Sequence, residues 1–289
     1  LSCPIFFQHT NLIYLCSSAW IGFALSAIFA ALQATELRQL EAIAAHIERG
    51  DADLSDEQVR WIKQIVAPGA SLGGARPKAG FRDLDGQLWL AKFPSTEDRL
   101  DVGLWEHLSY QLSLDAGIDL PEARLLQLSN RGHTHAVRRF DRTANSRRMY
   151  SSAMTRLDVS ESEGCSYLDL VQFIETHGTS TQIARDLEQL FRRVLFNILI
   201  GNRDDHLRNH GFLREGNGWV LSPAFDVNPN PDKNEHVLTL DGDDGSPDSR
   251  RLLATRDFYR LTAARSGPVE QEVRDAVREV EQTLVNLHS

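Results

Sequence analysis

Cysteine is scarce in this sequence, which contains only Cys3, Cys16 and Cys165 among its 289 residues. Three widely spaced cysteines cannot build a disulfide framework, and without a C-x-x-C pair they do not match the spacing of a structural zinc site. His133 and His135 alternate along one segment, but no third ligand at zinc spacing accompanies them. We therefore expect a cytoplasmic protein without a zinc site.

Glycine, proline and positive charge are also in short supply. The 19 glycines and 10 prolines are too few for a collagen-like or low-complexity chain. With 31 Lys and Arg against 40 Asp and Glu, the formal net charge is −9, which disfavours a general binder of phosphate backbones. The remaining composition, 42% hydrophobic and 25% charged, is typical of a globular chain with one large domain or two lobes.

Residues 12–32 carry no charge for 21 consecutive positions, which is long enough to cross a bilayer. The same stretch also fits a buried helix or a non-native leader. No Lys or Arg precedes Arg38, so the positive flank of a signal peptide is missing. We therefore treat 1–34 as a hydrophobic leader and do not expect membrane attachment. A membrane-tethered protein stays open as an alternative.

The apolar periodicity changes along the chain. Between residues 35 and 140, strand-like runs flank Asp85-Gly86 and Asn130-Arg131-Gly132, and a leucine recurs at every fourth position from Leu100 to Leu112. Residues 141–289 are mostly helical, with expected helices at 166–176, 182–200, 255–265 and 268–287 and short extended stretches at 219–225 and 236–240. The sequence therefore predicts a bilobal α+β fold, with a β-rich N-lobe at 35–140 and a mostly helical C-lobe at 141–289.

Charged residues with the spacing of a kinase site follow the most apolar of these helices. Asp204 and Asn209 match the D-x-x-x-x-N spacing of a kinase catalytic loop. Asp226 follows 17 residues after Asn209, where a second magnesium-binding carboxylate belongs. A polar loop with helix-capping Asp and Asn is the structural alternative for this spacing taken alone.

Two upstream features favour the kinase interpretation. Lys92 shares a strand face with apolar residues. A kinase carries the lysine that pairs with the ATP phosphates on a strand of this kind. Gly73-Gly74 precedes the cations Arg76 and Lys78 in a loop suited to wrap phosphates. Glu106 is a candidate partner of Lys92, and a solvated helix-surface glutamate is its alternative.

Two further acidic residues are assigned structural roles. Asp205 is expected to cap or hydrogen-bond within the loop that also carries Asp204. Asp141 and Arg142 are expected to form an ion pair that braces the neighbouring segment, and neither is assigned to catalysis.

Several motifs in this order resemble the HipA-type toxin kinases, which are Ser/Thr protein kinases of type II toxin–antitoxin modules. The resemblance rests on Ser71-Leu72-Gly73-Gly74-Ala75-Arg76-Pro77-Lys78, Ala91-Lys92-Phe93-Pro94, Arg139-Phe140-Asp141-Arg142, the run from Asn197 to Asn209, and Leu221-Ser222-Pro223-Ala224-Phe225-Asp226. It covers the chain from about Thr35 onward, as in a short form without the usual N-terminal subdomain.

The resemblance implies an ATP- and Mg²⁺-dependent enzyme with assigned roles in phosphoryl transfer. Asp204 matches the catalytic Asp, and Asn209 and Asp226 match the Mg²⁺ ligands. Lys92 matches the lysine on the ATP phosphates. His206 matches a histidine that contacts nucleotide or supports the Asp.

The resemblance also assigns the ATP pocket and a regulatory site. Arg138, Arg139 and Phe140 match the hinge that lines the adenine pocket. The loop formed by Ser71, Leu72, Gly73 and Gly74 covers the phosphates, and Ser71 matches a serine that family members autophosphorylate. Phosphorylation of Ser71 would add about two negative charges, and these would repel the phosphates of ATP.

The family also implies partners. Its substrates are translation proteins, chiefly aminoacyl-tRNA synthetases, and its toxins bind a HipB-like DNA-binding antitoxin. We expect no nucleic-acid contact beyond that complex. A small-molecule or phosphoinositide-type kinase and a non-catalytic kinase-fold partner of an antitoxin stay open as alternatives.

Overall fold

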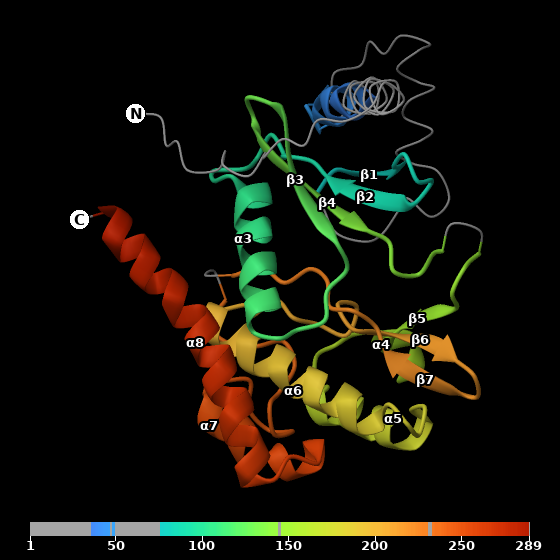
Figure 1. Ribbon diagram of the computed structural model, residues 1–289, viewed down its shortest axis with the longest axis vertical. Helices are drawn as coiled ribbons and strands as arrows, with labels where there is room; N and C mark the ends of the chain where they lie inside the picture. The colour runs from blue at the N-terminus through green and yellow to red at the C-terminus, as the bar shows by residue number, and fades with distance from the viewer. Residues whose placement is uncertain (1–35, 47, 50–75, 144–145, 231–232, 289) are drawn as a thin grey trace, which may run out of the picture.

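The computed structural model describes residues 36–46, 48–49, 76–143, 146–230 and 233–288, with side chains up to residue 278 (Figure 1). The strands are β1 (Lys78–Arg82), β2 (Leu88–Lys92), β3 (Ala123–Ser129), β4 (Gly132–Arg138), β5 (Tyr150–Ser152), β6 (Gly211–Glu215) and β7 (Gly218–Leu221). The helices are α3 (Val102–Asp115), α4 (Ala153–Arg156), α5 (Tyr167–His177), α6 (Ile183–Ile200), α7 (Ser249–Ala254), the 3₁₀ helix η1 (Arg256–Tyr259) and α8 (Ala263–His288).

A four-stranded antiparallel sheet with the order β1-β2-β4-β3 forms the first half of the fold. The expected turn between β1 and β2 is confirmed, with Gly86 at φ 74°, a left-handed conformation that glycine adopts without strain. A helix over residues 36–46 packs Leu37, Leu40 and Ala44 on one side of this sheet. Figure 1 shows α3 beside β4, on the way to the helical half.

Helix α3 buries only the second half of the leucine repeat, with Leu112 in the core and Leu108 packed against it. Leu100 and Leu104 are exposed, whereas Gly103 and Glu106 are buried. A β-carbon on Gly103 would lie 1.9 Å from the backbone oxygen of His133 in β4. The helix therefore approaches the sheet at a separation that needs glycine, and this turns Glu106 toward the protein interior.

The second half is mostly helical, and its core surrounds α6. Local sequence signals mark the start of α5 and the end of α6. Ser166 caps α5 through a capping box with Asp169, and Gly201 ends α6 in the left-handed conformation at φ 71°. Leu190, Phe191 and other apolar residues of α6 are fully buried. A three-stranded sheet with the order β5-β6-β7 lies alongside (Figure 1).

Two expectations for the C-terminal half are wrong in detail. Residues 236–240 form no strand and contribute only an isolated bridge between Thr239 and Ser166. The range 255–265 holds the short 3₁₀ helix η1 and the start of α8, and α8 then continues through Pro268 to include the helix expected at 268–287. Proline removes a single backbone donor, and Val269 and Val273 hold the helix by packing into the core.

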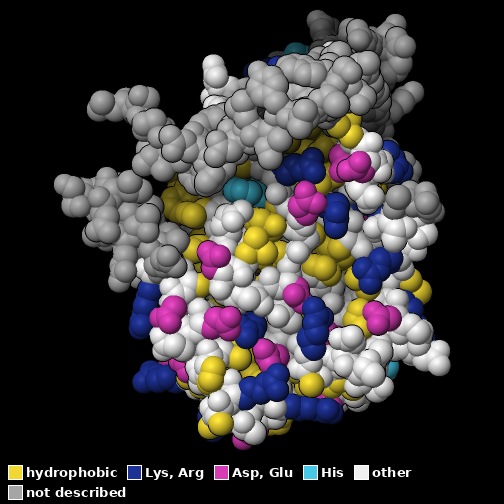
Figure 2. Space-filling model, viewed as in Figure 1, with side chains coloured by type: hydrophobic (Ala, Val, Ile, Leu, Met, Phe, Trp, Pro, Cys, Tyr) yellow, Lys and Arg dark blue, Asp and Glu magenta, His cyan; other side chains and the backbone are white. Residues whose placement is uncertain are grey.

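Some sequence expectations fall outside the described residues. They include the leader at 1–34, the helix expected from Ser55 to Val66 and the loop from Ser71 to Gly74. Among the described helices, none is both long enough and apolar enough to span a bilayer. On the face seen in Figure 2, basic and acidic side chains are interspersed, without a large patch of one sign.

Candidate active site

A cleft of about 740 Å³ lies between the four-stranded sheet and the helical half. Lys92 and Glu106 line it from the sheet side, and Asn209 and Asp226 line it from the helical side. The cleft therefore collects polar groups that are more than 100 residues apart in sequence. Such a concave site with converging polar side chains is typical of ligand-binding pockets.

Lys92 is the central charge of the cleft. Its ammonium donates to the Glu106 carboxylate and, at 2.7 Å, to Asp226 Oδ1. Burial alone would lower the pKa of Lys92, but these two carboxylates outweigh it and raise the pKa. Lys92 in turn lowers the pKa of Asp226. The Lys92–Glu106 pair, left open by the sequence, is present, and Lys92 stays charged at neutral pH.

Asp226 adopts an unusual backbone conformation, with φ at 60°. Non-glycine residues rarely adopt this left-handed region, and such outliers concentrate at functional sites. The segment before Asp226 is held in place, since the Ala224 N–H donates to the Asp119 carbonyl at 2.8 Å. The fold therefore fixes the Asp226 carboxylate at the cleft wall.

The loop after α6 carries the residues expected for phosphoryl transfer. Asn209 and His206 line the cleft, and Asp204 stands beside it, half exposed, without lining it. The Asn209 side chain donates to the Asp204 carbonyl oxygen at 3.4 Å, which joins the two ends of the loop. Lys233 donates to the Asp204 carboxylate.

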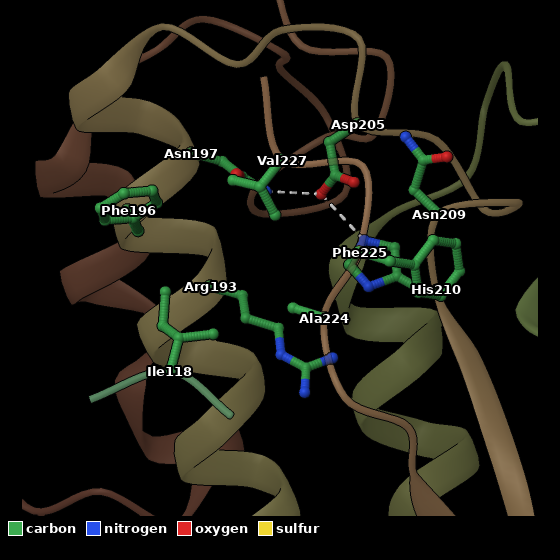
Figure 3. A pocket seen from close by; sticks show the side chains of 10 residues that line it. All are labelled: Ile118, Arg193, Phe196, Asn197, Asp205, Asn209, His210, Ala224, Phe225 and Val227. Atoms are coloured by element: carbon green, nitrogen blue, oxygen red, sulfur yellow. Dashed lines mark hydrogen bonds and ion pairs between the residues drawn. The ribbon is translucent and has the colours of Figure 1, made fainter. Parts of the chain in front are cut away.

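Asp205 anchors this loop to the helical core, as expected of a residue that hydrogen-bonds within it. Its Oδ2 accepts hydrogen bonds of 2.8 Å from Tyr167, Asn197 and His210. Burial would raise the pKa of Asp205, but His210 and these donors hold it below its ordinary value. Figure 3 shows Asp205 between Asn197 of α6 and His210, beside a small cavity that Arg193 also lines.

The expected hinge residues line the same cleft: Arg138, Arg139 and Phe140. Arg139 forms a two-pronged ion pair with Asp141, at 2.8 and 2.7 Å, and Arg142 pairs with the same carboxylate. The bracing role expected for Asp141 and Arg142 is thus consistent with the contacts. The Phe140 ring packs against the rings of Tyr150 and Phe225, which gives the cleft an aromatic wall.

The phosphate loop is only partly described. Ser71, Leu72, Gly73 and Gly74 lie outside the described residues. Arg76, expected to contact phosphates, instead pairs with Asp98 through both terminal nitrogens. Lys78 lines the cleft directly opposite Lys92 in the β1–β2 ladder, and burial followed by repulsion from Lys92 lowers its pKa.

Sequence reasoning did not assign several cleft residues. Tyr110 and His135 line the cleft with their rings in contact, and burial lowers the pKa of His135 to about 4, so that it is neutral at pH 7. His135 pairs with Lys92 across the β2–β4 ladder. The alternation along β4 could have indicated His135, because it places His135 on the same strand face as Val137, which also lines the cleft.

The donor atoms fit Mg²⁺ and a nucleotide. Asp226 and Asn209 supply the carboxylate and amide oxygens that hard cations prefer. Among the described residues, no group of three or more His, Cys, Asp or Glu side chains is arranged to hold a metal ion. Mg²⁺ is commonly bound by one or two carboxylates together with phosphate oxygens. The buried Nδ1 of His206 has no hydrogen-bond partner, and His206 is one of the residues that line the cleft.

Several known proteins are similar to this chain in sequence or in structure. A Haemophilus influenzae protein named "Putative kinase" is 26% identical over 203 residues, which cover 62% of this chain and 59% of that protein. HipA of Shewanella oneidensis MR-1, solved with HipB and operator DNA, superposes with a TM-score of 0.59 at 18% identity, over 79% of this chain and 65% of HipA. The Helicobacter pylori kinase CtkA gives a TM-score of 0.48 at 13% identity, over 73% of this chain and 95% of CtkA.

The likeness to Shewanella HipA confirms the kinase-like α+β fold expected from the sequence. The chain spans about three fifths of the length of the Haemophilus protein and about two thirds of HipA. A family model described as the HipA-like C-terminal domain matches residues 70–287, which include every described residue of the cleft. The chain therefore belongs to the HipA-like C-terminal domain family.

Proposed function

We propose that this chain is an ATP- and Mg²⁺-dependent protein Ser/Thr kinase, and the toxin of a HipA-type toxin–antitoxin module. The observation that carries the proposal is Lys92, which pairs with both Glu106 and Asp226 in a cleft that Asn209 also lines. A lysine held by a helix glutamate beside a metal-binding aspartate is the arrangement that phosphoryl transfer needs.

In this mechanism each residue of the candidate site has its own role. Lys92 binds phosphate oxygens, and Glu106 orients its ammonium. Asp226 and Asn209 would hold Mg²⁺, which neutralises charge on the phosphates. Asp204 orients the acceptor hydroxyl and accepts its proton.

The proposed ATP pocket extends from the phosphates to the aromatic wall. Phe140, with Arg138 and Arg139, lines the adenine side, and Leu72, Gly73 and Gly74 cover the phosphates. His206 contacts the nucleotide or supports Asp204. Ser71 is the proposed regulatory phosphosite, at which self-phosphorylation would repel ATP.

The substrate and partners proposed for the chain come from its family. We propose a translation protein such as an aminoacyl-tRNA synthetase as substrate, in the cytoplasm, and a HipB-like antitoxin as partner. The Shewanella HipA structure supports the second proposal, because that protein is bound to HipB and operator DNA.

Labelled ATP and Mg²⁺ test the proposed function. Purified protein should transfer γ-phosphate to serine or threonine of itself and of an added aminoacyl-tRNA synthetase, and Asp204→Asn should not. A parallel panel of phosphoinositides and small alcohols addresses the alternative kinase class. Absence of both ATP binding and transfer, in a folded preparation, would contradict the proposal.

A further inference from the structure

Lys233 lies in the segment that follows Asp226, and it contacts the proposed catalytic loop. Its ammonium forms an ion pair with the Asp204 carboxylate. Two more contacts join the same segments: the Arg203 guanidinium donates to the Lys233 carbonyl, and the Asn230 N–H donates to the Gly201 carbonyl at 2.9 Å. Two of these contacts involve Lys233 itself, one through its side chain and one through its carbonyl, and they place it beside Asp204.

Stability does not explain this ion pair. The side chains of Lys233 and Asp204 are 43% and 48% exposed, and pairs this exposed contribute little to folding. The same exposure leaves the pair open to a nucleotide and to an acceptor hydroxyl. A contact with a bound ligand therefore explains the position of Lys233 better than a contribution to folding does.

Lysine is rare in this chain, and its positions are informative. Arginine supplies most of the positive charge, since the sequence has only Lys63, Lys78, Lys92 and Lys233. All three lysines in the described ranges belong to the candidate site: two line the cleft and the third pairs with Asp204. An ammonium has three N–H donors, so Lys233 keeps two after it donates to Asp204.

We propose that Lys233 is a further catalytic residue, which holds Asp204 and a γ-phosphoryl oxygen at the same time. The inference rests on the proposed function. As Asp204 orients the acceptor hydroxyl, a cation bonded to Asp204 lies next to the bond that forms, where negative charge on the transferred group must be stabilised.

The step balances without any further reagent. The acceptor oxygen forms a bond to the γ-phosphorus while the bond between that phosphorus and the β–γ bridging oxygen breaks. ADP leaves with the electron pair of that bond, and the hydroxyl proton passes to the Asp204 carboxylate. Lys233 keeps its protons throughout and contributes only charge and hydrogen bonds.

Lys233→Met and Lys233→Arg test the role, with Arg250→Met as the matched control. Arg250 is a cation whose side chain is 88% exposed and pairs with Asp248, two residues away. We expect Lys233→Met to lower kcat about 100-fold or more with a small change in KM for ATP. Lys233→Arg should recover part of the loss, and Arg250→Met should match wild type.

Binding of a γ-phosphate mimic gives a readout that does not need turnover. Thermal shift or calorimetry compares ADP with ADP plus beryllium fluoride, both with Mg²⁺. We expect beryllium fluoride to tighten binding to wild type and to Arg250→Met at least tenfold more than to Lys233→Met, while ADP alone binds all three equally. A merely structural lysine would alter binding of both ligands alike.

The outcomes separate the two proposals. Faster transfer by Lys233→Met would show that Lys233 blocks Asp204, and unchanged kcat with unchanged beryllium fluoride binding would show that it is a surface pair. Either result overturns the role of Lys233 and leaves the kinase proposal intact. A wild-type protein that binds no ATP would overturn both.

Discussion

The backbone oxygen of His133 occupies the space that a β-carbon on Gly103 would need, at a separation of 1.9 Å. Helix α3 and strand β4 are therefore closer than any larger residue at position 103 allows. Glu106 lies one helical turn farther along α3, facing Lys92. The close approach at Gly103 thus sets the geometry of the ion pair in the cleft.

Gly103→Ala should disturb the fold and the site together. We expect the free energy of unfolding to fall by about 2 kcal/mol or more, because a backbone atom must move to admit the methyl group. ATP binding should weaken as α3 carries Glu106 away from Lys92. Gly267→Ala is the control, since Gly267 has open space around its α-carbon. Equal urea midpoints for the two variants would contradict this account.

Two adjacent aspartates should respond differently to substitution. Asp204→Asn should abolish most phosphoryl transfer and leave the urea midpoint near wild type, because Asp204 is half exposed. Asp205→Asn should cost about 2–4 kcal/mol of stability, because the buried carboxylate accepts three hydrogen bonds. Paired activity and unfolding measurements check this contrast. Comparable unfolding midpoints would disprove it.

Asp226→Asn separates metal binding from folding. Asparagine tolerates the left-handed backbone of this position, where φ is 60°, so we expect the variant to fold. Loss of the carboxylate should lower phosphoryl transfer by orders of magnitude and raise the Mg²⁺ concentration needed for half-maximal activity. Activity measured over a range of Mg²⁺ concentrations checks this, and near-wild-type turnover would remove Asp226 from the metal site.

Asp186 should make stability depend on pH. It is 1% exposed and accepts the Leu221 N–H at 2.8 Å, and burial raises its pKa to about 6. A raised carboxyl pKa means that the folded state binds the proton more tightly, so the penalty is full above pH 6 and disappears below about pH 4. Relative to Asp186→Asn, wild type should therefore gain about 1 kcal/mol of stability from pH 7.5 to pH 5. Urea unfolding at both values tests the sign.

Ser71 should act as a phosphosite that regulates ATP binding. Ser71→Ala should keep the fold and nucleotide binding while it removes self-phosphorylation. Ser71→Asp should lower ATP affinity, because its charge repels the phosphates. Mass spectrometry of protein incubated with ATP locates the phosphate. Phosphate found only at other positions, or equal ATP affinity of the two variants, would rule this role out.

Local signals in the sequence determined much of this protein. The hairpin at Asp85-Gly86, the helix that begins after Ser166 and the apolar helix that ends at Gly201 were each predicted from a few neighbouring residues, and the structure has all three. The order of Lys92, Asn209 and Asp226 along the chain also predicted one cleft, which these residues line. Short-range patterns report such features because turns, caps and helix faces depend on nearby residues.

Only the tertiary structure decided how distant segments meet. The leucine repeat does not report which face of α3 meets the sheet: Leu100 and Leu104 are exposed, whereas Gly103 is buried against the backbone of His133, 30 residues away. The pairing of Lys233 with Asp204 likewise depends on the path of the chain after Asp226. Neither contact follows from local propensity, because each is set by the packing of elements that are remote in sequence.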